Sequence, residues 1–263
     1  MTKLHIFCYN IFMNTKLSRN QIKLICAIYM VAAHLLFCFF GPQHIMTRAI
    51  YTVGEFVPVL FSYFIAEGYI LSSNKLRYAV RLLIFGLISQ PLYMASIASN
   101  RNRLNIILLF SVCVFTLFLY NHNSQDTALY IFRPLILTCI LGLVYFCEGD
   151  YLFFGIVLIF YTAIIKKWSC EKMFAIVGGY YALFYFIFKV FVYPDVFMLI
   201  FFEEGLFGIL IGYLLLKVHY DKSIWIKSKL AKYSFYILYP AHFIAIAGIH
   251  LLQYYGYLPK VLY

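Results

Sequence analysis

The chain has 263 residues, of which 64% are hydrophobic, 21% aromatic and only 12% charged, and its net charge is +11. Soluble domains carry about 25% charged residues, so this composition excludes a disordered chain, a secreted disulfide scaffold and an ordinary cytosolic enzyme. We therefore predict an all-α polytopic membrane protein, whose length leaves room for about eight to ten transmembrane helices.

Apolar stretches recur along the whole chain, and about nine can be distinguished. In chain order they are Ile22–Phe40, Tyr51–Leu71, Leu76–Ala98, Leu104–Tyr120, Arg133–Cys147, Tyr151–Ile165, Met173–Tyr193, Val196–Leu216 and Tyr233–Gln253. The fifth and sixth are short for a full crossing and are separated only by Glu148-Gly149-Asp150. This spacing fits either a tight hairpin or a pair of re-entrant segments.

The basic residues divide unequally between the two sides that these stretches define. One side collects most of the 21 Lys and Arg residues, including those of the polar loop Lys217–Lys232. The other side holds Arg48, Arg101, Arg103, Lys260 and, near the end of its helix, Lys189. By the positive-inside rule the N-terminus is cytoplasmic, and topology accounts for the basic excess without a nucleic-acid partner.

Residues 1–21 lack the continuous apolar core and the cleavage site of a signal peptide, so we predict a cytoplasmic N-terminal extension there. Either Met1 or Met13 can serve as the start. A single transmembrane helical domain is expected over residues 22–253, followed by a short C-terminal tail over residues 254–263.

Two ionisable residues lie on the first stretch, where burial in lipid is expensive and each is therefore a candidate functional group. Lys23 lies near the cytoplasmic end, and His34 follows about three helical turns later, so both project from one face about 16 Å apart along the axis. A cation at the cytoplasmic end of the helix and a titratable ring deeper in the membrane suit an anionic ligand that enters from the cytosol. The alternative is a snorkelling lysine and a histidine that hydrogen-bonds a neighbouring helix.

The third stretch begins with basic residues and contains a proline further along. Arg77 and Arg81 are one turn apart and can clamp phosphates at the membrane surface; an ordinary positive-inside flank is the alternative. Deeper in this helix, Gln90 precedes Pro91, which frees a backbone carbonyl that normally lines protein or water. Gln90 is therefore a candidate substrate-binding residue.

Acidic residues mark further positions in the apolar stretches. The segment Gly54–Pro58 interrupts the second stretch, and Glu67 lies at its inner end. Glu67 is either a partner of the arginines that open the third stretch or a substrate-binding group. Glu203 and Glu204 in the eighth stretch have Lys189 as a credible ion-pair partner.

The last stretch carries Tyr239 and His242 on either side of Pro240. His242 is a candidate second base or substrate ligand, and Tyr239 a candidate substrate-binding hydroxyl, provided that they face the same cavity as His34. Nucleophile-elbow, Walker A, dinucleotide-binding and zincin motifs are absent from the sequence. An enzyme with this sequence is expected to use a general base and direct transfer, without a metal or a covalent serine intermediate.

Short motifs follow one another in a specific order, although each is weak alone. They are Ile22–Leu24, Met30–His34, Phe56–Phe61, Ala66–Gly68, Lys75, Tyr78–Leu82, Phe85–Tyr93, Asp150–Tyr151 and Lys232–His242. In this order they resemble the TraX family over about residues 19–250. TraX-like proteins are polytopic proteins of the bacterial inner membrane, one of which acetylates the N-terminal amine of conjugative pilin, and they are similar to integral-membrane acyltransferases that use acyl-CoA.

The resemblance implies an acyltransferase with acetyl-CoA as co-substrate and a pilin-like, peptide or glycan acceptor. On this basis His34 is the expected general base, and Lys23, Arg77 and Arg81 are expected to face the CoA phosphates. A transporter or permease for a small anionic molecule is the alternative, as is a non-catalytic membrane subunit.

This chain departs from the usual family pattern at two places. Ala33 stands directly before the histidine, where the family usually has an acidic residue. Glu55 follows Gly54, where the family favours arginine.

Overall fold

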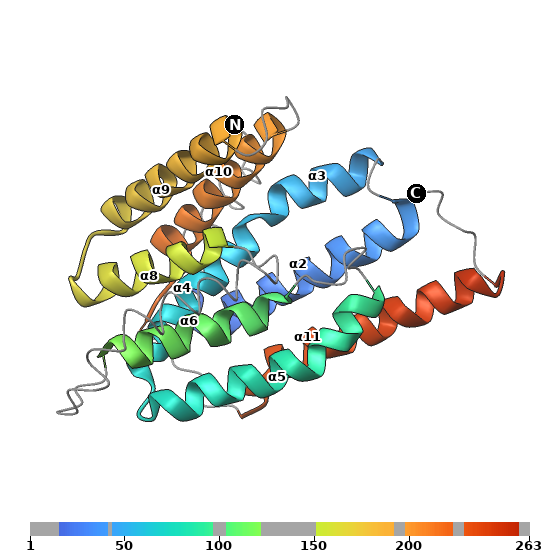
Figure 1. Cartoon of the computed structure of the whole chain (residues 1–263), viewed down its shortest axis with the longest axis horizontal. Helices are drawn as coiled ribbons and strands as arrows, with labels where there is room; N and C mark the ends of the chain where they lie inside the picture. Colours follow the sequence, from blue (N-terminus) through green and yellow to red (C-terminus); the bar gives the residue numbers. More distant parts are fainter. Residues whose placement is uncertain are drawn as a thin grey trace, which may run out of the picture. The chain divides into compact units, whose positions relative to one another are not determined.

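The structure, a computed structural model, describes residues 16–41, 44–96, 104–121, 151–191, 198–222 and 229–257 (Figure 1). Within these ranges every regular element is a helix, which confirms the all-α class for the described part of the chain. The helices are α2 (Arg19–Phe40), α3 (Ile45–Gly54), α4 (Phe56–Leu71), α5 (Lys75–Ser96), α6 (Ile106–Asn121), α8 (Tyr151–Ile165), α9 (Cys170–Phe191), α10 (Met198–Leu214), the π-helical turn η1 (Leu215–His219) and α11 (Lys229–Tyr254).

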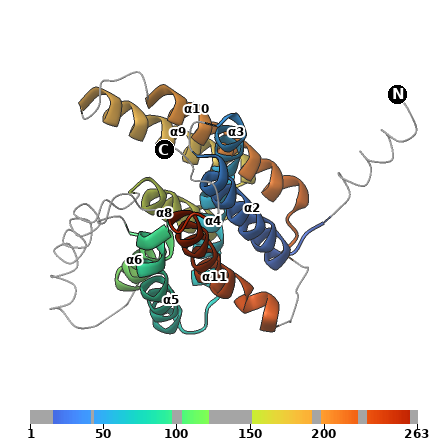
Figure 2. The same ribbon diagram turned by 90° about the vertical axis from the view of Figure 1, so that its right-hand side faces the viewer.

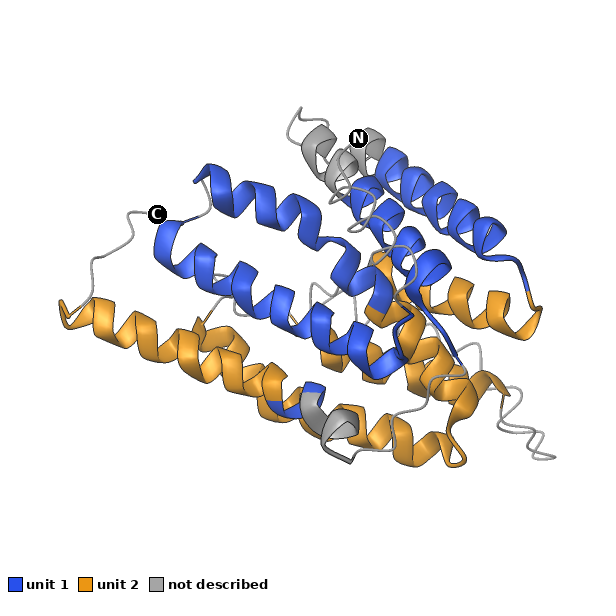
Figure 3. Cartoon of the chain, turned by 180° about the vertical axis from the view of Figure 1, so that it is seen from behind, with its two compact units in different colours: residues 1–60, 168–237 blue, residues 61–167, 238–263 orange. Residues whose placement is uncertain are grey.

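The chain divides into two compact units, each assembled from segments that are distant in the sequence (Figure 3). Unit 1 comprises residues 1–60 and 168–237, and unit 2 comprises residues 61–167 and 238–263. Unit 1 therefore contains α2, α3, α9, α10 and η1, whereas unit 2 contains α5, α6 and α8.

In unit 1 the segment that precedes α2 pairs with the segment that follows η1. Leu17 forms an isolated β-bridge with Tyr220, and its N–H donates to the carbonyl of His219 (2.7 Å). Ser18 then begins α2 with a capping box that it shares with Gln21. The cap defines where the first apolar helix starts, and the bridge ties this start to η1.

The helices of unit 1 are joined by close contacts between α3 and its two neighbours, α2 and α10, and between α9 and α10 (Figure 2). On α2, the Tyr29 hydroxyl donates to the Ile50 carbonyl of α3 (2.7 Å), and the Tyr29 ring lies against Gly54. A hydrogen bond and an aromatic contact therefore fix the register of α2 against α3.

In unit 2, α5 packs against α6, and α6 packs against α8 (Figure 1). Gly86 of α5 allows the close approach, because a Cβ atom there would lie 2.7 Å from the Leu108 side chain of α6. At the start of α5, the Lys75 ammonium donates to three carbonyls at the end of α4, with distances of 2.6–2.8 Å. Lys75 thus satisfies the carbonyls that the end of a helix leaves without intrahelical partners.

Among the described residues, four segments are long and apolar enough to cross a membrane, which makes the chain a membrane protein. They are Arg19–Phe40, Ile45–Leu71, Lys75–Ser96 and Phe235–Tyr254, and shorter apolar helices cover Ile106–Asn121, Leu152–Ile165 and Gly205–His219. The count of about nine spans and the cytoplasmic N-terminus stay predictions. The fifth predicted stretch, Arg133–Cys147, lies outside the described residues.

The second apolar stretch begins at Ile45, so the predicted start at Tyr51 was wrong. The helix begins earlier because His44 caps it, with Nδ1 accepting from the Met46 N–H (3.3 Å). The predicted interruption is confirmed: α3 ends at Gly54, and α4 begins after the single residue Glu55.

Gly208 of α10 provides a test of the packing in unit 1. A Cβ atom there would lie 2.5 Å from the backbone carbonyl carbon of Glu55, and backbone atoms cannot rotate away. We expect Gly208→Ala to lower the free energy of unfolding by about 1–3 kcal/mol. Gly179→Ala in α9 is the matched control, because its Cβ atom would meet nothing within 4 Å. Thermal unfolding in detergent compares the variants, and equal melting temperatures would contradict the close approach.

Candidate functional site

The predicted site residues fall in both units. Unit 1 contains Lys23 and His34, and unit 2 contains Glu67, Arg77, Arg81, Gln90, Tyr239 and His242. The expected general base thus shares a unit with one expected cofactor-binding cation, and the predicted substrate-binding residues share the other.

Lys23 and His34 project from the side of α2 that packs against protein. The buried residues of this helix are Ile22, Cys26, Ala27, Ala33 and Cys38. At about 100° per residue they cover an arc of about 160°, and both Lys23 and His34 fall inside it. Exposed apolar side chains, among them Leu24 and Ile28, lie outside that arc. Both ionisable residues are themselves half-buried, so they face protein while part of each side chain stays accessible.

Tyr51 of α3 is an aromatic neighbour of His34. The two ring centroids are 6.4 Å apart, with the planes tilted by 43°. Phe37, one turn further along α2, packs edge-on against the same tyrosine at 5.9 Å. Tyr51 therefore covers the turn of α2 that carries His34. Sequence reasoning missed this residue, whose only signal is a phenol within an apolar helix.

Arg77 and Arg81 have different surroundings although they lie one turn apart on α5. Arg77 is exposed, whereas Arg81 is half-buried with its guanidinium carbon 5.4 Å from the centre of the Tyr78 ring. Asn74 accepts a hydrogen bond from the Arg77 N–H (2.8 Å) where α5 begins. Both arginines thus lie near one end of the helix, where a phosphate clamp at a membrane surface would need them.

Glu67 lies deep within the helical core of unit 2 and is only 3% exposed. The hydroxyl of Tyr63, one turn earlier on α4, donates to its Oε1 at 3.5 Å. The Tyr63 ring packs edge-on against Phe160 of α8. A buried carboxyl in an apolar helix is costly, which keeps Glu67 among the candidate functional residues.

Gln90 binds the N-terminus of α6. Its Oε1 accepts from both the backbone N–H and the side-chain amide of Asn105, at 2.9 and 2.8 Å. The Asn105 amide also donates to the Gly86 carbonyl (2.8 Å), and its Oδ1 accepts from the N–H groups of Ile107 and Leu108. Asn105 is 1% exposed, so these bonds satisfy a helix start that water cannot reach.

Tyr239 and His242 are both buried on α11, with 3% and 5% of their surface exposed. Tyr239 is hydrogen-bonded to the backbone of Ile106, in the first turn of α6. The His242 ring packs on Phe243 with centroids 3.9 Å apart, and its Nδ1 donates to the Leu238 carbonyl (3.2 Å). Because a carbonyl can only accept, this bond places the ring hydrogen on Nδ1 and makes Nε2 the basic nitrogen of the neutral ring.

The structure therefore brings Gln90 and Tyr239 to one place, the start of α6. The ring contact between Tyr93 of α5 and Phe243 of α11, at 5.5 Å, joins the two helices that carry them. Sequence reasoning missed Asn105, which connects this group. Its signal was an asparagine directly before an apolar run, which is the pattern of a helix N-cap.

The side chains of Lys189, Glu203 and Glu204 lie outside the described residues, so their predicted ion pair stays a prediction. Within the described ranges, no group of three His, Cys, Asp or Glu side chains is arranged to hold a metal ion.

Apolar helices of spanning length, with titratable side chains on their protein-facing sides, define a helical integral membrane protein. The model of the family described as TraX protein matches residues 18–250, so the chain belongs to the TraX family and the resemblance is confirmed. The chain is similar to a probable fimbrial assembly protein, FimC of serogroup H1, from Dichelobacter nodosus, with 33% identity over 88 residues. This match covers 34% of the chain and 36% of the relative's length. No solved structure matches.

Two asparagine caps allow the buried network to be tested. Asn105→Ala removes the cap of α6, which leaves the buried N–H groups of Ile107 and Leu108 without their acceptor, and it removes the side-chain hydrogen bonds to Gly86 and Gln90, so we expect a loss of about 2–4 kcal/mol in the free energy of unfolding. Asn74→Ala removes a cap at an exposed position and should cost about 1 kcal/mol or less. Denaturant unfolding in detergent measures both, and similar losses in the two variants would contradict the role given to the buried network.

Proposed function

We propose that this chain is an acyltransferase of the bacterial inner membrane. It would transfer an acetyl group from acetyl-CoA to an amine or hydroxyl of a pilin-like, peptide or glycan acceptor. The observation that carries the proposal is the position of Lys23 and His34 within the protein-facing arc of α2. Membership of the TraX family and the similarity to a fimbrial assembly protein support an acceptor connected with pili.

In the proposed reaction His34 is the general base. Its neutral imidazole takes a proton from the acceptor while the acceptor nitrogen or oxygen attacks the thioester carbonyl carbon. A C–N or C–O bond forms and the C–S bond breaks. The CoA thiolate leaves with the electron pair and recovers the proton from the imidazolium. Histidine suits this role because the free side chain titrates near neutral pH. Tyr51, whose ring also contacts Phe37, lies beside the His34 ring.

Lys23 is the proposed contact for the CoA phosphates on the same helix. It lies about 16 Å from His34 along the axis, a separation that the extended pantetheine arm between the phosphates and the thioester can span. Arg77 and Arg81 are the further proposed phosphate ligands, and Glu67, Gln90, Tyr239 and His242 are proposed to contribute to acceptor binding or proton transfer.

Ligand stabilisation tests the cofactor first. Acetyl-CoA at 100 times its Kd should add roughly 2.7 kcal/mol to the free energy of unfolding of the detergent-solubilised protein. Lys23→Ala and Arg81→Ala should lose most of this gain, because each removes a proposed phosphate contact. Arg48→Ala, which removes an exposed cation of α3, is the control and should keep it. Absence of any gain at millimolar acetyl-CoA would favour a transporter or a non-catalytic subunit.

His34→Gln tests the chemical step in proteoliposomes supplied with radiolabelled acetyl-CoA and an amine-bearing pilin peptide. Loss of a general base should lower the transfer rate by about 10²–10⁴-fold, with stabilisation by acetyl-CoA unchanged. His250→Gln makes the same replacement on α11 and should transfer at the wild-type rate. A His34→Gln variant that transfers normally would remove His34 from the mechanism.

A further inference from the structure

Basic side chains from three distant segments gather at one end of unit 1. We call Lys16, Arg19, Lys172, Lys217 and Lys222 the basic end. The bridge between Leu17 and Tyr220 joins the segment before α2 to the segment after η1. The Lys16 ammonium strengthens this junction by donating to the Val218 carbonyl (2.8 Å).

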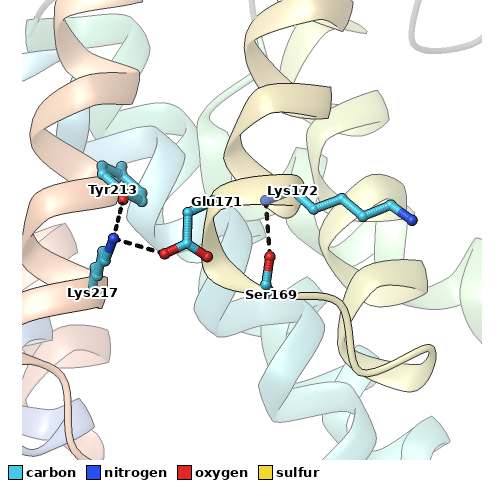
Figure 4. A network of polar contacts seen from close by, with 5 residues as sticks. All are labelled: Ser169, Glu171, Lys172, Tyr213 and Lys217. Atoms are coloured by element: carbon cyan, nitrogen blue, oxygen red, sulfur yellow. Dashed lines mark hydrogen bonds and ion pairs between the residues drawn. The ribbon is translucent and has the colours of Figure 1, made fainter.

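The third segment, the start of α9, joins the basic end through an ion pair. The Lys217 ammonium lies 2.7 Å from Glu171 Oε1 and donates to the Tyr213 hydroxyl at 2.7 Å (Figure 4). Lys222 lies close enough to act electrostatically on Cys170, beside Glu171. The three segments therefore present their cations over one continuous part of unit 1.

Glu171 is a negative charge within this group, and Asp221 is adjacent to Lys222 in the chain. The hydrogen bond from Lys217 lowers the pKa of Glu171 to about 2, and the same bond raises the pKa of Lys217. The pair therefore stays ionised at neutral pH, and five basic residues outnumber the two acidic ones. The basic end keeps a net positive charge.

The cations are spread out and do not converge on one point. In Figure 4 the Lys172 side chain extends away from the Glu171–Lys217 pair. Its ammonium lies over the ring of Trp168, 4.8 Å from the ring centre. Tryptophan and tyrosine next to lysine at the ends of apolar helices are typical of the membrane–water interface. Dispersed cations suit a charged surface better than a single small anion.

We propose that the basic end is a docking surface for anionic phospholipid headgroups of the leaflet on the side predicted to be cytoplasmic. The long apolar helix α2 starts directly at this group, so the cations lie at the level where headgroup phosphates end the hydrocarbon layer. The lipid surface would thereby hold the junction between Leu17 and Tyr220 against the membrane. This inference is independent of acyl transfer.

Trp168 provides a local probe of the lipid. In a Trp225→Phe background it is the single tryptophan of the chain, since the sequence contains two. The protein is reconstituted in phosphatidylcholine vesicles that contain brominated phosphatidylglycerol or brominated phosphatidylcholine, and quenching of Trp168 gives the relative affinity for the two headgroups. We expect a clear preference for phosphatidylglycerol that weakens in high salt.

Variants that remove a positive charge and a variant that removes a negative charge should change the lipid preference in opposite directions. Lys172→Gln and Lys217→Gln should each weaken the preference about fivefold, which corresponds to about 1 kcal/mol per basic residue at an anionic surface. Glu171→Gln should strengthen it, because it removes a negative charge and releases Lys217. Arg48→Gln, the matched control at an exposed cation of α3, should leave it unchanged.

Three results would overturn the proposal. One is equal quenching by the two brominated lipids in the wild-type background. Another is a preference that Lys172→Gln and Lys217→Gln do not alter while circular dichroism shows folded helices. The last is displacement of phosphatidylglycerol by millimolar inorganic phosphate, which would indicate a small-anion site.

Discussion

The buried N-terminus of α6 shows the constraint on which much of this structure depends. A helix end exposes backbone N–H groups, and lipid or apolar protein offers them no water. Here the Asn105 side chain accepts from two of these groups, and Gln90 accepts from the N–H of Asn105 itself. Tyr239 is hydrogen-bonded to Ile106 in the same turn. One requirement for hydrogen bonds therefore brings α5, α6 and α11 together in unit 2.

Unit 1 also satisfies backbone groups near a helix end, in this case through another segment of backbone. The N–H of Leu17, just before α2, donates to the carbonyl of His219, at the end of the π-helical turn.

Polar side chains on the protein-facing side of a helix need not be structural, however. Lys23 and His34 lie within the protein-facing arc of α2, where ionisable side chains are costly and therefore mark candidate functional positions. In the proposed chemistry they act on the phosphates of acetyl-CoA and on the acceptor that attacks its thioester.

Charge in this protein is organised at two levels. Along the sequence, basic residues are concentrated in loops of one predicted side, which sets the orientation of the helices. In three dimensions, three of these loops join through a β-bridge and through the ion pair between Glu171 and Lys217. The position of each cation in the fold therefore distinguishes Lys23, within the protein-facing arc of α2, from the cations of the basic end.

The sequence by itself determined the membrane class, the helical fold, the position of most helices and the break near Gly54, because these depend on local hydrophobicity and on local backbone chemistry. It also determined that Lys23 and His34 share one face, which is a property of a single helix. Only the tertiary structure showed that this face packs against protein, that Tyr51 covers His34 and that Asn105 joins Gln90 to the start of α6. These relations depend on which helices pack together, and residues distant in the chain carry no periodic signal of their contact.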